Sequence, residues 1–140
     1  MSLVNPIPFP IRWFSLVNGN TLNQLFGAPQ FSTENGITAT AGGGKTSARL
    51  LKATINQVSV CATGNDSLKL PANPQPGNVV FIANDGAAAA QVYGSNNDTI
   101  DAVATATGVA LTNATRAFFL CTGSSGGIAT WVSQAGAKAT

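Results

Sequence analysis

The sequence predicts an all-β fold: a single domain of short antiparallel strands forming a β-sandwich, a jelly-roll-like or a barrel-like domain. Three observations lead to this prediction. From residue 57 onward, short apolar or alternating stretches recur, with Gly, Pro, Asn and Asp clustered between them as turn signals. No long amphipathic helix is visible, and 140 residues are enough for one domain with a substantial core.

The chain divides into three parts of different composition. Residues 1–33 are predicted to be an extended, Pro-rich N-terminal arm, within which residues 20–26 favour a short helix. Residues 34–53 are rich in Gly and Thr and are predicted to be a connector. Residues 54–140 are predicted to be the β domain.

The expected strands follow one another at short intervals in the β domain. The triplet Asn84-Asp85-Gly86, between two apolar runs, predicts a hairpin. The expected strands are residues 57–62, 67–70, 79–83, 89–93, 108–111, 115–121 and 128–132.

Two of these strands are apolar on both faces. Val79 and Phe81 point to one side of their strand, and Val80 and Ile82 point to the other. Residues 115–121 show the same pattern. A two-layer sandwich covers only one face of each strand, so these strands need a second cover. We expect that cover to come from another subunit, which predicts a homo-oligomer; a cover from the chain's own arm is the alternative.

Charged residues are scarce, at 9% of the chain where about 25% is usual. Scattered charges keep free monomers apart, so the low content also favours self-association. A net charge of +2 argues against nucleic acid as the main partner, and no stretch approaches the length of a membrane span. The first residues do not resemble a signal peptide, so we expect cytoplasmic synthesis, with Cys61 and Cys121 as reduced thiols. By strand phase, Cys61 should share a face with Gln57, and Cys121 should share a face with Phe119.

No motif predicts catalysis, a cofactor or a metal site. Residues 39–46 match a relaxed P-loop pattern, but no buried apolar strand precedes them, so we expect no nucleotide site. The chain contains no His, which excludes Ser-His-Asp and Cys-His arrangements. Residues 97–101 offer oxygen ligands for calcium but lack the loop pattern, so a turn is expected there. We therefore expect a protein that is not an enzyme.

Two groups of residues are candidates for contacts with a partner or another subunit. The arm combines a stiff Pro-rich backbone with large aromatic side chains, which are common anchors of interfaces. The connector holds the only basic cluster, which is either a solvated face or a contact with an acidic surface of a partner. The candidates are Phe9, Trp13 and Phe14 in the arm, and Lys45, Arg49 and Lys52 in the connector.

Several short motifs occur in a characteristic order between residues 36 and 132. They are residues 41–44 with 47–48, 56–58, 66–71, 79–82 with 84–87 and 91–94, 98–101, and 118–121 with Trp131. In order and spacing they resemble a family of small virion proteins of tailed bacteriophages and prophages. Some members look like capsid decoration, or cement, proteins, which are β-rich trimers at threefold positions on the phage head. This chain departs from the family pattern at Asn65 and in the Pro-rich loop of residues 72–77.

The resemblance implies a structural virion protein that forms a homotrimer and binds the major capsid protein on the capsid exterior. It carries over no catalytic residues. A tail, fibre or baseplate component is the main alternative. A carbohydrate-binding module is the second; it would need an exposed aromatic platform, and Trp13, Tyr93 and Trp131 are too few to demand one.

Overall fold

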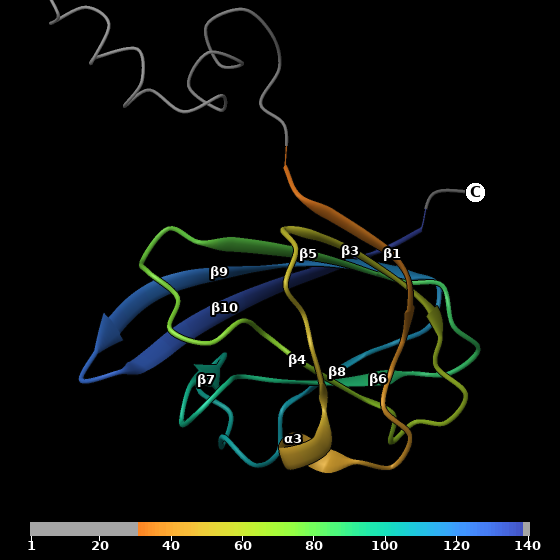
Figure 1. Cartoon of the computed structure of the whole chain (residues 1–140), viewed down its shortest axis with the longest axis horizontal. Coiled ribbons are helices and arrows are strands. Elements are labelled where there is room, and N and C mark those ends of the chain that lie inside the picture. The colour runs from red at the N-terminus through yellow and green to blue at the C-terminus, as the bar shows by residue number, and fades with distance from the viewer. Residues whose placement is uncertain (1–30, 139–140) are drawn as a thin grey trace, which may run out of the picture. The chain divides into compact units, whose positions relative to one another are not determined.

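The computed structural model describes residues 31–138, and these form an all-β unit, as the sequence predicts. Ten strands and one single-turn helix make up this part of the chain (Figure 1). The predicted arm and its short helix, with Phe9, Trp13 and Phe14, lie outside the described residues. The strands are β1 (Thr33–Thr38), β2 (Arg49–Leu50), β3 (Ile55–Val60), β4 (Ser67–Lys69), β5 (Val79–Asn84), β6 (Ala90–Tyr93), β7 (Thr99–Ile100), β8 (Val109–Leu111), β9 (Thr115–Ser125) and β10 (Ile128–Ala137), and the helix is α3 (Gly44–Ser47).

The strands form two sheets with a common core between them (Figure 1). The six-stranded sheet has the order β1-β3-β5-β9-β10-β7, and the four-stranded sheet has the order β2-β4-β6-β8. Trp131 and Phe119 are the largest fully buried side chains of the core and come from the six-stranded sheet. Leu68 and Val92 face them from the four-stranded sheet, and both are fully buried.

The first six strands alternate between the two sheets, which makes much of the pairing parallel. β1, β3 and β5 run parallel to one another in one sheet, and β2, β4 and β6 do so in the other. Each return to a sheet comes after a full turn through the other sheet, so the chain re-enters in the same direction. Only β5–β9, β9–β10 and β6–β8 are antiparallel among the described pairings. The prediction of purely antiparallel strands is therefore wrong.

The segment predicted as a connector, residues 34–53, is part of the fold. It contains β2, α3 and most of β1, and its side chains Ile37, Ala39 and Leu51 are buried in the core. The Thr and Gly content suggested a loop, but a few inward apolar side chains are enough to join this segment to the core. The compact unit therefore begins at Ser32, ahead of the predicted start of the β domain.

Asn84-Asp85-Gly86 does not form the predicted hairpin. β5 ends at Asn84 in the six-stranded sheet, and β6 begins at Ala90 in the four-stranded sheet, so the triplet turns a corner between the sheets. The Asn84 side chain is fully buried and holds this corner: its Nδ2 donates to the carbonyls of Ala88 and Leu111, and its Oδ1 accepts from Gly86 N. A buried amide that satisfies several backbone groups stabilises the corner without any strand pairing across it.

β9 and β10 form a hairpin and are longer than the predicted strands of residues 115–121 and 128–132. Its strands continue to Ser125 and restart at Ile128, so the turn is reduced to Gly126-Gly127. Both glycines have positive φ, +59° and +78°, as the two central residues of a type I′ turn require.

Candidate interaction site

The outward side of the six-stranded sheet carries an apolar surface. Register places Ile55, Phe81 and Phe118 in one row across β3, β5 and β9. A second row contains Val79, Leu120 and Val132 from β5, β9 and β10. We call these six residues the apolar outer face.

The apolar outer face is uncovered in the part of the chain that the structure describes. Ile55, Phe81 and Val132 are 37%, 41% and 39% exposed, and Phe118 is half-buried. Their sequence neighbours Val80, Ile82 and Phe119 point inward and are buried. The prediction that these strands are apolar on both faces is therefore confirmed. Contiguous exposed apolar surface of this kind marks interaction sites in soluble proteins.

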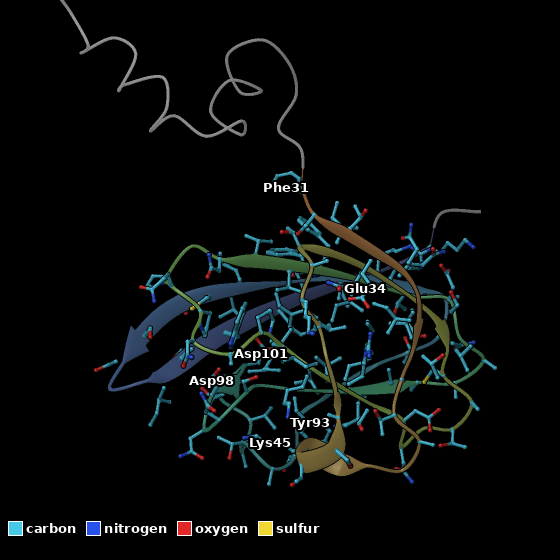
Figure 2. All side chains as sticks on the ribbon, in the orientation of Figure 1. Phe31, Glu34, Lys45, Tyr93, Asp98 and Asp101 are labelled. Carbon is cyan, nitrogen blue, oxygen red and sulfur yellow. The ribbon has the colours of Figure 1, made fainter. Side chains whose placement is uncertain are left out.

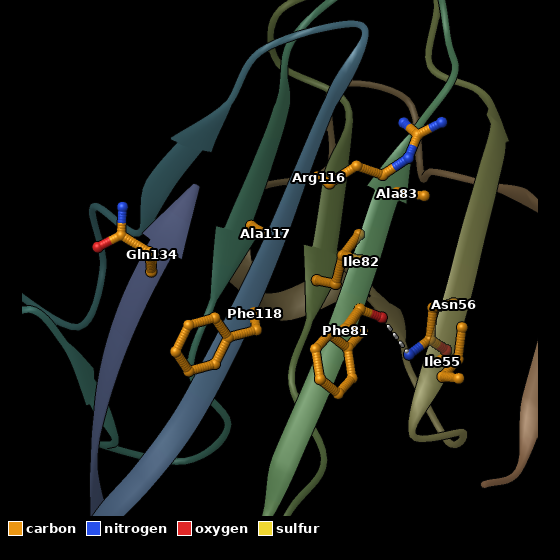
Figure 3. A pocket seen from close by; sticks show the side chains of 9 residues that line it. All are labelled: Ile55, Asn56, Phe81, Ile82, Ala83, Arg116, Ala117, Phe118 and Gln134. Atoms are coloured by element: carbon orange, nitrogen blue, oxygen red, sulfur yellow. Dashed lines mark hydrogen bonds between the residues drawn. The ribbon is translucent and has the colours of Figure 1, made fainter. Parts of the chain in front are cut away.

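A hollow of about 400 Å³ lies in this surface, between β3, β5 and β9 (Figure 3). The Phe81 and Phe118 rings lie side by side over neighbouring strands, with centroids 6.2 Å apart and planes tilted by 39°. Such tilted aromatic pairs are favourable and present both ring faces and edges to a ligand. Arg116 and Gln134 stand at the rim, as Figure 3 shows.

One end of the surface carries a small charged network. Asp85 accepts hydrogen bonds from Gln57 Nε2 at 2.9 Å and from Arg116 Nη2 at 2.9 Å, and Lys138 Nζ lies 3.7 Å from the same carboxylate. The Gln57 hydrogen bond, followed by that of Arg116, lowers the pKa of Asp85 below its usual value. The guanidinium of Arg116 is thus held in place at the edge of the hollow.

The basic residues predicted as contacts do not form one free patch. Arg49 pairs with Glu34 on β1 at 2.8 Å, and Lys45 Nζ donates to the Asn96 carbonyl (Figure 2 labels Glu34 and Lys45). Lys52 is exposed. Two of the three cations thus bind within the chain itself, which weakens the alternative of a contact with an acidic partner. The sequence could not show this, because Glu34 and Asn96 come from distant positions.

The four-stranded sheet presents a different outward side. A polar hollow of about 460 Å³ lies there, lined by Gly42, Gly44, Asn65, Gln91, Tyr93 and Thr107. The helix α3, from the P-loop-like segment, packs against β4 beside it and is a single turn of four residues. Tyr93 and Trp131 are 8% and 0% exposed, so neither provides an exposed platform for stacking sugars.

The acidic segment of residues 97–101, where a turn was expected and not a calcium site, anchors β10. Asp98 is buried, and its Oδ1 accepts from Ala129 N at 2.8 Å. Asp101 accepts from Ser133 N at 2.8 Å and from Ser133 Oγ (both aspartates are labelled in Figure 2). Within the described residues, no group of three or more His, Cys, Asp or Glu side chains is arranged to hold a metal ion.

Both cysteines are buried free thiols. Cys121 faces inward beside Phe119, as predicted. Cys61 was expected on the face of Gln57, which is exposed, but β3 ends at Val60 and the chain turns there, so Cys61 is buried and Val60 is 47% exposed. Burial raises the pKa of both thiols, with a further contribution from Asp66 at Cys61.

Comparisons with known proteins find no match for this chain, whether among protein-family models, curated proteins or solved structures. Residues 31–138 contain no helix of sufficient length and hydrophobicity to cross a bilayer. The candidate site therefore depends on its own geometry, and the apolar outer face is its most distinctive feature.

Proposed function

We propose that this chain is a structural virion protein that acts by binding other protein chains, as a decoration or cement protein on the outside of a phage capsid. The apolar outer face carries the proposal that the chain binds protein. The resemblance of residues 36–132 to small phage virion proteins supports the virion and the capsid as its place of action. The proposal assigns no catalytic activity and no cofactor to the chain, and it places synthesis in the bacterial cytoplasm before assembly.

The proposed mechanism is stabilisation by mass action. A subunit that binds the assembled shell, and not its dissociated parts, lowers the free energy of the assembled state. A homotrimer presents three copies of its capsid-binding surface, so modest affinity per copy adds up through multivalency. The low charge content of the chain agrees with a surface that is covered in the assembly.

The first experiment measures self-association of the full-length chain by light scattering. We expect a multimer for the wild type and a shift toward monomer for the double variant Phe81→Ser, Phe118→Ser. Val60→Ser is the control, because Val60 is more exposed than either phenylalanine but lies outside the apolar outer face. A wild-type monomer at high micromolar concentration would remove the self-association part of the proposal.

The second experiment tests the capsid. The wild-type chain should pellet with shells of the phage major capsid protein and raise the temperature at which they dissociate, and the double variant should do neither. Electron microscopy of virions with the chain labelled then shows its position. A label on the tail, fibre or baseplate would replace the capsid assignment with the alternative that the sequence left open.

A further inference from the structure

The hollow on the apolar outer face is lined mainly by apolar and aromatic side chains. Phe81 and Phe118 form its aromatic wall, Ile55 extends the row across β3, and Ala83 leaves space between them and Arg116 (Figure 3). A hollow of about 400 Å³ falls within the range of sites that bind ligands of a few side chains.

A ligand in this hollow cannot bind by joining the sheet as a further strand. β5 is already paired with β3 and β9, and β9 is paired with β5 and β10, so their backbone groups are occupied. Of the two edge strands of the described sheet, β1 is irregular, with shifts of register between Glu34 and Ile37 and between Ile37 and Thr38, and β7 has only two residues. Such irregular edges resist strand addition. The ligand must therefore dock through its side chains.

Polyproline II segments dock in this manner. They fill aromatic-lined grooves with proline and apolar side chains, and their unpaired carbonyls accept hydrogen bonds from groups at the rim. Gln134 provides such a group, since its exposed amide makes only a long 3.4 Å bond, to the Ala135 carbonyl. Arg116 lines the hollow as well; its Nη1 and Nη2 donate to the Thr115 carbonyl and to Asp85, and the guanidinium has further N–H groups.

The chain contains one segment of this chemistry. In residues 5–10, Asn5-Pro6-Ile7-Pro8-Phe9-Pro10, three prolines alternate with apolar residues. The prolines fix the backbone in an extended form and remove the amide donors that strand pairing needs. This segment lies outside the described residues, and the hollow lies within them.

We propose that the hollow between Phe81 and Phe118 binds residues 5–10 of a second copy of the chain. This inference rests on the self-association in the proposed function and names the contact that produces it. Each copy then donates one segment and accepts another, a heterologous contact that closes into a ring when the rotation allows, as in a trimer.

The length of the connection favours a second copy over the same chain. Strands in a sheet lie about 4.8 Å apart, so the hollow is only about 12 Å from β1, where the described chain begins. About four extended residues would cover that distance. Residues 11–30 supply far more, since the fully extended length of 20 residues is about 66 Å. A connection of that length suits a site on a neighbouring subunit.

Photo-cross-linking in the full-length chain tests the contact and its source. A photoreactive phenylalanine analogue replaces Phe9, and light and ¹⁵N-labelled copies are unfolded, mixed and refolded together before irradiation. We expect cross-links from residue 9 to β5 or β9 that join a heavy to a light copy. Cross-links confined to copies of one isotope would assign the hollow to the chain's own segment and overturn the proposal. Cross-links to other strands alone would also overturn it.

Substitution and competition provide the second test. The full-length triple variant Pro6→Ser, Pro8→Ser, Pro10→Ser keeps the apolar residues but loses the stiff backbone, and we expect self-association at least about tenfold weaker. Pro29→Ser is the control and should associate as the wild type does. A synthetic peptide of residues 4–14 should dissociate the multimer, while a scrambled peptide should not.

Failure of this inference is distinct from failure of the proposed function. If the wild type forms a multimer that neither the triple variant nor the peptide weakens, the segment does not fill the hollow, although self-association stands. If the wild type is a monomer, both this inference and the self-association part of the proposed function are wrong.

Discussion

The outward sides of the two sheets differ in what they offer to solvent. The six-stranded sheet presents the apolar outer face, with Phe81 and Phe118 over its hollow. The four-stranded sheet presents a hollow of similar volume lined by Gln91, Tyr93 and small or polar residues, with α3 packed beside it. Both sheets share one core, so packing of that core does not explain the difference. The proposed function accounts for the apolar side by a partner chain that covers it.

The sharpest test of the comparison uses two neighbouring residues of β10 that point to opposite sides. Trp131 is fully buried and Val132 is 39% exposed. Trp131→Ala should lower the free energy of unfolding by about 3–5 kcal/mol, because it leaves a large cavity in the core. Val132→Ser should change it by about 0.5 kcal/mol or less in the monomer. Urea unfolding of both variants measures this. Equal losses would mean that the outward side is part of the stabilising core.

The corner between the two sheets provides the next test. A Cβ at Gly86 would lie 2.6 Å from both the Cβ and the backbone N of Cys61, so Gly86→Ala forces the corner to move. We expect a loss of about 1–3 kcal/mol in the free energy of unfolding. Gly64→Ala is the control, since a Cβ there meets nothing within 4 Å, and it should cost about 0.5 kcal/mol or less. An unchanged free energy of unfolding in the Gly86→Ala variant would contradict this close approach of the corner to Cys61.

The sequence predicted which side chains of the central strands share a face, but it did not predict which strands pair with one another. The alternation correctly placed Phe81 opposite Ile82 within residues 79–83, and Phe118 opposite Phe119 within residues 115–121, because a strand has a period of two whatever its neighbours. That period does not say to which sheet a strand belongs. A corner such as Asn84-Asp85-Gly86 uses the same residue types as a hairpin, so the parallel order of β1, β3 and β5 was missed.

Short elements with few inward side chains were also missed. β2 has two residues, β7 has two, and β1 buries Ile37 alone, which is too little for a periodic signal. For the candidate site, the sequence indicated a second apolar face but could not show its extent. Ile55 and Val132 join it only through the register of β3 and β10 with the central strands.

Low pH should lower the stability of the protein through a different carboxylate at each of the two sheets. Asp66, next to β4, accepts hydrogen bonds from Thr63 Oγ1 and from Ala62 N, both at 2.6 Å, and chiefly the Thr63 bond lowers its pKa. A carboxylate with a lowered folded pKa contributes stability above its unfolded pKa of about 3.9, and this contribution is lost as the pH falls through the folded value. Asp66→Asn should therefore be less stable than the wild type at neutral pH and lose less stability below about pH 4.

Asp85, at the end of the apolar outer face, is the matched comparison. Its pKa is also lowered, so the direction of the pH effect is the same, but its ion pairs are partly exposed. Salt screens such pairs, so the effect of Asp85→Asn should shrink in about 0.5 M NaCl while that of Asp66→Asn persists. Urea midpoints across pH 2.5–7 at two salt concentrations decide this. Equal salt sensitivity would contradict the distinction.

The smallest effect concerns the cysteines and needs no substitution. Cys121 lies on the inward side of β9 between the outward residues Leu120 and Thr122, and Cys61 is buried near the corner. Their raised pKa values and burial should slow alkylation at about pH 8, at least about 100-fold relative to the urea-unfolded chain. Mass spectrometry of the labelled chain measures both sites at once. Under non-reducing conditions it also shows whether the thiols are reduced, as the sequence predicts.

The same labelling tests whether the peptide of residues 4–14 acts through the apolar outer face, if covering that face stabilises the six-stranded sheet. The double variant Phe81→Ser, Phe118→Ser has lost the site, so addition of the peptide should leave labelling of its Cys121 unchanged. Slower labelling of Cys121 in that mixture would place the peptide elsewhere on the chain.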